Sequence, residues 1–144
     1  MASEEKQGLL TRWVEKNREK VLAMLEGFAE EEEAIENWVM CETAPAEILD
    51  WLPVLDWIHH ALTKNYVLCL TNKRFLIIRT KGVSTNVKDS EALPLSGVVS
   101  IEERQRPLTA HLVVRPADGR QTTFKEVIRE AATSFVADFE SLGI

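Results

Sequence analysis

The stretch Tyr66-Val-Leu-Cys-Leu-Thr-Asn-Lys-Arg-Phe-Leu-Ile-Ile-Arg79 decides the fold of this 144-residue chain. It contains two runs rich in β-branched and aromatic residues, Tyr66–Thr71 and Arg74–Thr80, which are separated only by Asn72-Lys73. A two-residue link containing a residue that tolerates positive φ is typical of a tight β-hairpin. The sequence therefore predicts two antiparallel strands joined at Asn72 and Lys73.

Both faces of this predicted hairpin are apolar. The segments Val67–Leu70 and Phe75–Ile78 lack the polar alternation of a sheet that has one face in water. A cover for the outer face is needed, and the candidates are the segment Leu10–Phe28 or a second subunit. Apolar residues recur every three or four positions in Leu10–Phe28, which predicts an amphipathic helix ending near Gly27. Its spacing, with Asn17 inside, also suits pairing of two helices.

The rest of the chain predicts five more strands and one closing helix. The strands are expected at Ile35–Cys41, Val87–Leu95, Val98–Arg104, Thr109–Arg115 and Arg120–Lys125. Residues alternate between two faces in the first of these strands. One face is expected to carry Ile35, Val39 and Cys41, and the other Trp38 and Met40. The final segment, Val127–Leu142, has a clear apolar stripe and is expected to dock on the sheet as a helix.

Two connecting segments have distinct compositions. The acidic run Glu30–Glu33 is expected to be a solvated linker. The segment Ala46–Thr63 has helical spacing, but Pro53 cannot lie inside a helix without cost, so two short helices or a kink after Leu52 are expected.

Seven antiparallel strands followed by one amphipathic helix is the order of the pleckstrin-homology-like (PH-like) superfold. The stretch Tyr66–Arg79 resembles the second-and-third-strand hairpin of GRAM and bacterial PH domains, with its Leu-Thr-Asn-x-Arg motif. Leu93–Ile101 resembles their corner between the fourth and fifth strands, and Ala117–Phe124 resembles their last turn and strand. The resemblance implies an α+β fold, a seven-stranded antiparallel β-barrel or sandwich capped by a C-terminal helix.

We therefore expect a single domain over residues 1–144. It would consist of an N-terminal helix at 9–28 and a PH-like core at 35–142, with a helical insertion at 46–63 between the first two strands. A chain of this length can bury one sufficient core without disulfides or metals. The N-terminal helix and the insertion lie outside the family core, so specific function is expected there.

Charge is divided unevenly along the chain, although the total is −6. Residues 1–63 carry 5 Lys and Arg against 14 Asp and Glu, whereas residues 64–144 carry 12 against 9. An acidic protein repels a polyphosphate backbone, so no nucleic-acid partner is expected. With no targeting or membrane-spanning segment in the sequence, a cytoplasmic location is expected, with contact at membranes as an alternative. Cys41 and Cys69 lack metal or redox spacing and are expected to be free buried thiols.

One group of cations stands out in the strand half. A hairpin places Lys73 and Arg74 at one end of the sheet and the remaining cations of the group at the other. The resemblance assigns phosphoinositide binding to that other end. The lipid-binding candidates are Lys64, Arg79, Lys81 and Lys88. Against this, Asp50 and Asp56 occupy the place of the family's basic first loop, and cations on sheet edges also serve to prevent aggregation.

Large apolar residues outside the strands are the other candidate surface. Tryptophan-rich patches are frequent hot spots of protein interfaces. The protein-interaction candidates are Trp51, Leu52, Trp57 and Trp13. Burial of these side chains in the domain's own core is the alternative.

The sequence contains no known catalytic motif. It also lacks a metal-ligand pattern, because Asp56, His59 and His60 supply too few ligands for a zinc site. We therefore expect no enzyme activity, no metal and no cofactor. The sequence favours a noncatalytic binding or assembly module that contacts a protein partner or a second copy of itself as a homodimer. The alternative is peripheral docking on an anionic membrane surface. A small-molecule carrier would need an enclosed polar pocket.

Overall fold

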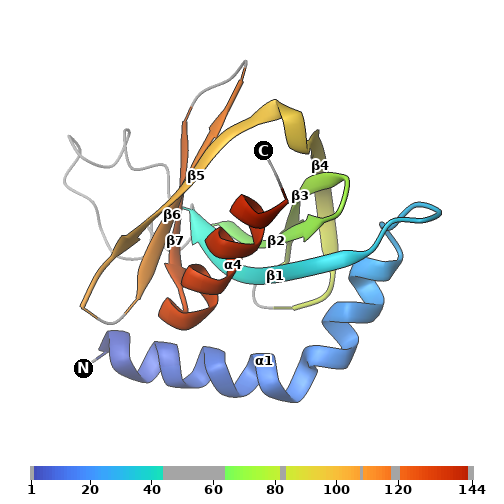
Figure 1. The fold of residues 1–144 in the computed structure, drawn as a ribbon. Coiled ribbons are helices and arrows are strands. Elements are labelled where there is room, and N and C mark those ends of the chain that lie inside the picture. The colour runs from blue at the N-terminus through green and yellow to red at the C-terminus, as the bar shows by residue number, and fades with distance from the viewer. Residues whose placement is uncertain (1, 44–63, 82–83, 108, 118–120, 143–144) are drawn as a thin grey trace.

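Within the residues that the structure describes, the chain forms a seven-stranded sheet with a helix near each end of the sequence (Figure 1). The computed structural model describes residues 2–43, 64–81, 84–107, 109–117 and 121–142. The elements are α1 (Ala2–Glu26), β1 (Ile35–Thr43), β2 (Lys64–Thr71), β3 (Arg74–Thr80), β4 (Val87–Pro94), η1 (Leu95–Gly97), β5 (Val98–Gln105), β6 (Ala110–Pro116), β7 (Thr122–Val127) and α4 (Arg129–Ser141). The α+β fold expected from the sequence is confirmed.

All strand pairings are antiparallel, in the order β4-β3-β2-β1-β7-β6-β5. The pairing of Glu42 with Lys125 joins β1 to β7 and so connects the two halves of the sheet. Figure 1 shows β5–β7 running across the direction of β1, with α4 beside both halves. The predicted helical insertion at 46–63 lies outside the described residues.

The sheet has an apolar core on each face, as the composition of the hairpin requires. The inner core lies between the sheet and α4, and the outer core lies between β1–β3 and α1. Along β2, Leu68 and Leu70 point into the inner core, whereas Val67 and Cys69 point into the outer core. All four side chains are fully buried. Successive side chains of a strand lie on opposite faces, so a strand covered on both sides has no polar positions.

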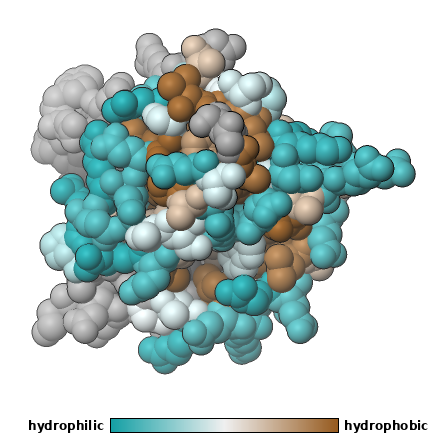
Figure 2. Space-filling view, in the orientation of Figure 1, coloured by the Kyte–Doolittle hydropathy of each residue, from teal (hydrophilic) through white to brown (hydrophobic). Residues whose placement is uncertain are grey.

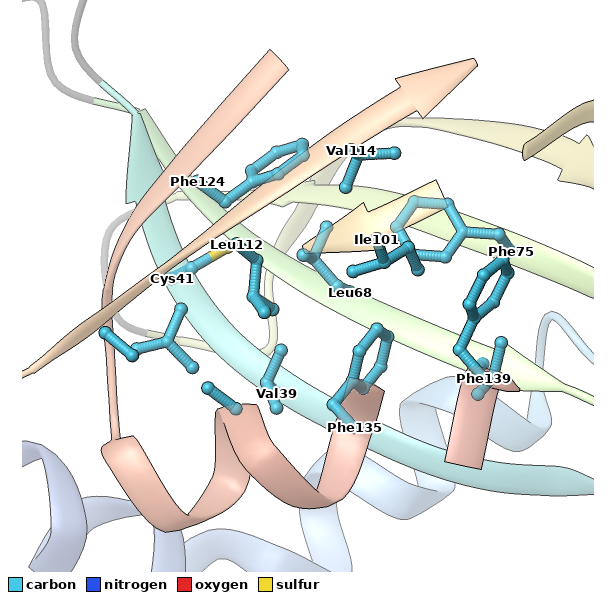
Figure 3. Packing of buried hydrophobic residues seen from close by; sticks show 14 of the residues in the cluster. Val39, Cys41, Leu68, Phe75, Ile101, Leu112, Val114, Phe124, Phe135 and Phe139 are labelled. Carbon is cyan, nitrogen blue, oxygen red and sulfur yellow. The ribbon is translucent and has the colours of Figure 1, made fainter. Parts of the chain in front are cut away.

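The C-terminal helix closes the inner core. Its side chains Phe135 and Phe139 point toward Ile101 and Phe75 of the sheet (Figure 3). The rings of Phe135 and Phe75 meet edge to face with centroids 6.1 Å apart, a favoured arrangement for aromatic pairs. The predicted docking of this helix on the sheet is therefore confirmed.

The N-terminal helix covers the outer face of β1–β3. Val21 and Leu25 of α1 are fully buried against Met40, Val67 and Leu76 among others. Of the two covers proposed from the sequence, the chain's own helix therefore takes this role. The helix spans Ala2–Glu26, so it begins seven residues before the start predicted at residue 9.

A bulge at the start of β1 corrects one predicted side-chain direction. The register shifts between Ile35 and Asn37, which pair with Thr71 and Leu70. Because the extra residue reverses the alternation, Ile35 packs in the outer cluster with Trp38 and not in the inner one with Val39. Periodicity alone does not show such a shift.

The β2–β3 turn forms as predicted, but not for the predicted reason. Asn72 is not among the non-glycine residues with positive φ. Instead, the Thr71 hydroxyl accepts hydrogen bonds from the backbone N–H groups of Lys73 (3.1 Å) and Arg74 (2.8 Å). A side-chain hydroxyl that replaces a backbone acceptor in this way stabilises a turn without left-handed geometry.

The acidic segment before β1 is bound to this turn, which corrects its prediction as a solvated linker. The Glu33 side chain has 0% exposure and receives two hydrogen bonds from Arg74, at 2.7 and 2.9 Å. The Thr71 hydroxyl also donates to Glu33, at 2.6 Å. Asn72 exchanges backbone and side-chain hydrogen bonds with Ala34. The Leu-Thr-Asn-x-Arg motif thus fixes the path of the chain from α1 into β1.

Candidate functional site

A groove lies where α1, β1 and α4 approach one another. Its volume is about 200 Å³. Figure 2 shows small apolar areas between the mostly hydrophilic surfaces of α4 and α1. The lining residues are Val14, Arg18, Asn37, Trp38, Val39, Met40, Val127, Ile128, Ala131 and Ser134. Three segments that are far apart in the sequence therefore meet at this one site.

The α1 wall follows from helical spacing. Val14 and Arg18 are four residues apart, so both lie on the same face of the helix. The Arg18 guanidinium carbon lies 5.9 Å from the centre of the Trp38 ring, in a cation–π arrangement. Trp38 is half-buried and packs in the outer cluster under α1, because it lies on the opposite face of β1 from Val39.

Polar contacts between β1 and α4 fix the other wall. The Asn37 amide donates to Asp138 Oδ2 at 2.8 Å and to Ser134 Oγ at 3.1 Å. The side-chain Oδ1 of Asn37 accepts a hydrogen bond from the backbone N–H of Trp38 at 2.8 Å. These bonds hold α4 against β1 beside the Trp38 ring, so the groove is formed before any ligand binds.

The chemistry of the groove favours an apolar group next to an anion. Among the described residues that line it, Arg18 is the only charged one, and most of the others are apolar. The volume is below the range of roughly 300–1,000 Å³ that is usual for small-molecule pockets. It suits one large side chain of a partner, and Arg18 at the edge suits a carboxylate.

The structure brings the lipid-binding candidates to one end of the sheet, as predicted. Thr43 pairs with Lys64 and Asn65 pairs with Thr80, so the ends of β1, β2 and β3 meet there. Lys81 follows β3 directly and is exposed.

One of the lipid-binding candidates is already paired with an acid, which reduces the positive charge available at this end of the sheet. Asp89 pairs with Arg79 across β3 and β4, with a contact of 3.4 Å between Arg79 Nη1 and Asp89 Oδ2. Lys88, which precedes it in β4, is exposed. In the part of the chain that the structure describes, neither Lys81 nor Lys88 forms an ion pair. Two of the four candidates are thus available cations.

The protein-interaction candidates are only partly placed. Trp51, Leu52 and Trp57 lie outside the described residues. Trp13 is half-buried and packs at the edge of the outer cluster under α1. The Asn17 amide donates to the carbonyl oxygen of Trp13 at 2.9 Å, so it bonds within its own helix.

Sequence reasoning missed Asn37, Trp38 and Ser134. The alternating pattern of β1 had placed Trp38 on the face opposite Val39, and that was the available signal for it. No pattern in the sequence indicates that Asn37 meets Ser134, because 97 residues separate them.

The two cysteines are buried free thiols, as predicted. Cys41 lies in the inner cluster and Cys69 in the outer one, on opposite faces of the sheet. Burial raises the pKa of Cys69 to about 12 and raises the pKa of Cys41 strongly. Both groups therefore stay protonated at neutral pH, and thiolate chemistry is suppressed at both positions.

Two kinds of feature are absent from the described residues, a membrane-spanning helix and a cluster of metal ligands. Neither α1 nor any other described helix is both long and apolar enough to span a bilayer. The described ranges also contain no group of three or more His, Cys, Asp or Glu side chains arranged to hold a metal ion.

Comparisons with known proteins agree with the fold. Neither the protein-family models nor the curated proteins give a match to this chain. Among solved structures, the chain is similar to the hSac2 domain from human phosphoinositide phosphatase Sac2, with a TM-score of 0.52 and 14% identity over 87% of this chain and 79% of that one. It is also similar to the C-terminal domain of an unknown protein from Leishmania infantum, with a TM-score of 0.50 and 10% identity over 90% and 97% of the two chains. At these identities the similarity shows a shared fold, and the resemblance to GRAM and bacterial PH domains stays a prediction.

Proposed function

We propose that this protein is a noncatalytic protein-binding module and that the groove between α1, β1 and α4 is its binding site. The observation that carries the proposal is the half-buried Trp38, which lies in a groove held open by side-chain contacts between three elements. The proposed ligand is a segment of a partner protein that carries a large apolar side chain beside an Asp or Glu.

Residue types in the groove support this choice. Tryptophan and arginine are the residues that most often dominate the binding energy of interfaces. Here the Arg18 guanidinium already lies over the Trp38 ring, so less conformational entropy is lost when a partner orders the two side chains. The guanidinium keeps all its hydrogen-bond donors available for a carboxylate, since no described acid pairs with it.

The partner we propose is a different protein. Self-association through the stripe of α1 has less support, because Val21 and Leu25 of that stripe are buried in the outer cluster. Polar residues dominate the opposite side of the helix, including Arg12, Glu15 and Lys16. A homodimer remains one outcome that a measurement of mass by light scattering would detect.

A charge reversal in the groove tests this function. Peptides selected on the full chain from a random library are expected to share an aromatic or large aliphatic residue next to Asp or Glu. Arg18→Glu should weaken their binding at least about tenfold, because attraction becomes repulsion at the groove. The shift of the Trp38 indole N–H signal in NMR spectra would locate the bound peptide.

Arg12→Glu is the matched control, because Arg12 is also an exposed arginine of α1 but does not line the groove. The control should bind the selected peptides as the unmodified chain does. Peptides without an acid, or equal binding to Arg18→Glu and the unmodified protein, would refute the proposed groove.

Membrane docking is the second candidate function. It is supported by the exposed side chains of Lys81 and Lys88 at the sheet end predicted for lipid binding. Near an anionic surface each such cation contributes about 1 kcal/mol. We propose that the two lysines attract vesicles containing phosphatidylserine, with salt-dependent binding.

The test is sedimentation with such vesicles. Lys81→Glu combined with Lys88→Glu should abolish binding, whereas Lys16→Glu combined with Lys20→Glu on the exposed side of α1 makes the same change in net charge and should not. Binding that survives the first pair of substitutions, or that is lost equally in both pairs, would argue against docking by this end of the sheet.

A further inference from the structure

Three basic side chains form a row across the outer face of β5, β6 and β7. Arg104 of β5 pairs directly with His111 of β6. On the other side of β6, Lys125 and Glu126 lie in the bulge of β7 between the pairings of Leu112 with Phe124 and Ala110 with Val127.

The face on which this row lies follows from strand alternation. Leu112 and Phe124 point into the inner core. Their neighbours His111 and Lys125 therefore point outward, since successive side chains of a strand lie on opposite faces. Adjacent strands are roughly 4.8 Å apart, so Arg104 and Lys125 flank the imidazole at about that spacing on each side. A tetrahedral anion above His111 is within reach of both long side chains.

Among the described residues, the charges that act on His111 are cations, and the acids of this face lie beside those cations. Arg106 lies two residues after Arg104 and adds a further cation at the β5–β6 turn. The backbone N–H of Arg106 donates to the Thr109 carbonyl oxygen. Glu102 lies 3.8 Å from Arg104, but it also lies 3.5 Å from Arg115 and is shared between them.

Two further acids adjoin Lys125: Glu126 follows it in the β7 bulge, and Glu42 pairs with it from β1, two strands away from His111. Like charges on neighbouring strands destabilise a sheet unless a counter-charge compensates them.

The pKa of His111 is shifted by these surroundings. Burial lowers the pKa of His111, and the nearby charges of Arg106, Lys125 and Arg104 lower it further. The ring is therefore neutral at pH 7 and retains one N–H donor. A neutral donor between two cations is a suitable set of groups for an oxyanion, which accepts hydrogen bonds from all three.

We propose that Arg104, His111 and Lys125 bind a compact oxyanion of the phosphate class on the outer face of β5–β7. The site is separate from the groove and from the sheet end that carries Lys81 and Lys88, so it does not depend on the proposed function. Either free phosphate or a phosphate group on a larger soluble molecule supplies the required chemistry.

NMR titration of the histidine signals in the full chain tests this site, with inorganic phosphate as the probe in a phosphate-free buffer. His111→Gln identifies the His111 signal among the three histidines of the chain. Bound phosphate favours the charged imidazolium, so the pKa of His111 should rise when phosphate binds. Lys125→Gln and Arg104→Gln should each weaken phosphate binding about fivefold or more, because each removes one charge-assisted contact.

Lys20→Gln removes the same charge from the exposed side of α1, away from every proposed site, and is the matched control. Unchanged phosphate binding in this control, with weaker binding in Lys125→Gln, supports the site. Equal weakening in both would show general charge attraction and overturn it. A His111 pKa that does not respond to phosphate would also overturn it, and so would a response confined to phosphatidylserine vesicles, which would indicate a membrane surface.

Discussion

Glu33 and Arg74 show how a single ion pair holds two elements together. The Arg74 guanidinium donates to both carboxylate oxygens of Glu33 and also to the carbonyl oxygen of Phe28 at the end of α1. Mainly through the hydrogen bonds from Arg74, and also through that from Thr71, the pKa of Glu33 falls from 4.5 to about 2. The carboxylate is therefore far more stable in the folded chain than in the unfolded one.

This difference predicts how stability depends on pH. The stabilisation by Glu33 is complete above its unfolded pKa of 4.5 and decreases as the pH falls through its folded pKa of about 2. Urea unfolding at a series of pH values between these limits should show the decrease. In Glu33→Gln the dependence should be weaker over the same interval, because the titrating group is absent.

The same substitution should also lower stability at neutral pH. Without the Glu33 carboxylate, Arg74 keeps its longer contact of 3.5 Å with Glu30, but the loss of the short hydrogen bonds should cost about 1–3 kcal/mol. Glu31→Gln is the control, because Glu31 is exposed and the turn contacts it through its backbone carbonyl. Equal free energies of unfolding for Glu33→Gln and the unmodified chain would contradict the role given to this pair.

At the scale of elements, the apolar stripe of α1 and the two-sided hairpin explain each other. The composition of Val67–Leu70 required a cover, and the stripe of α1 supplies it. The bounds of the strands agree closely with the sequence-based prediction, because turn residues punctuate them. Two features were not predicted: the bulge after Ile35 and the hydroxyl-bonded turn at Thr71. The bulge depends on pairing with β2, which a local pattern does not record, and the turn depends on the direction of the Thr71 side chain, which composition alone does not show.

The contact between α1 and the sheet leads to a prediction about stability. Leu25 of α1 is fully buried against the sheet, with 0% exposure. Leu25→Ala should therefore lower the free energy of unfolding by about 2–4 kcal/mol. Urea denaturation monitored by circular dichroism would measure the loss. Glu26→Ala changes the exposed neighbour and should stay within about 0.5 kcal/mol of the unmodified chain. A similarly small effect of Leu25→Ala would mean that the helix does not cover the sheet in solution.

At the scale of the whole molecule, the candidate sites consist of groups from distant parts of the chain. The groove combines Arg18 of α1 with Trp38 of β1 and Ser134 of α4. The basic row combines Arg104 and Lys125 with His111, from three strands that follow one another around the sheet. Of the residues proposed from the sequence, Lys81 and Lys88 are exposed at the expected end of the sheet, whereas Arg79 is paired with Asp89.

The sequence by itself determined the strands, the two helices at 10–28 and 127–142, and the need for apolar cover on both faces of the hairpin. These properties follow from periodicity, because the burial of a side chain is set by the face of its own element. Only the tertiary structure decided that Glu33 is buried by Arg74, that Asn37 joins β1 to α4, and that His111 lies between Arg104 and Lys125. Strand order, register and helix docking determine these contacts, and each depends on interactions between segments that the chain separates by many residues.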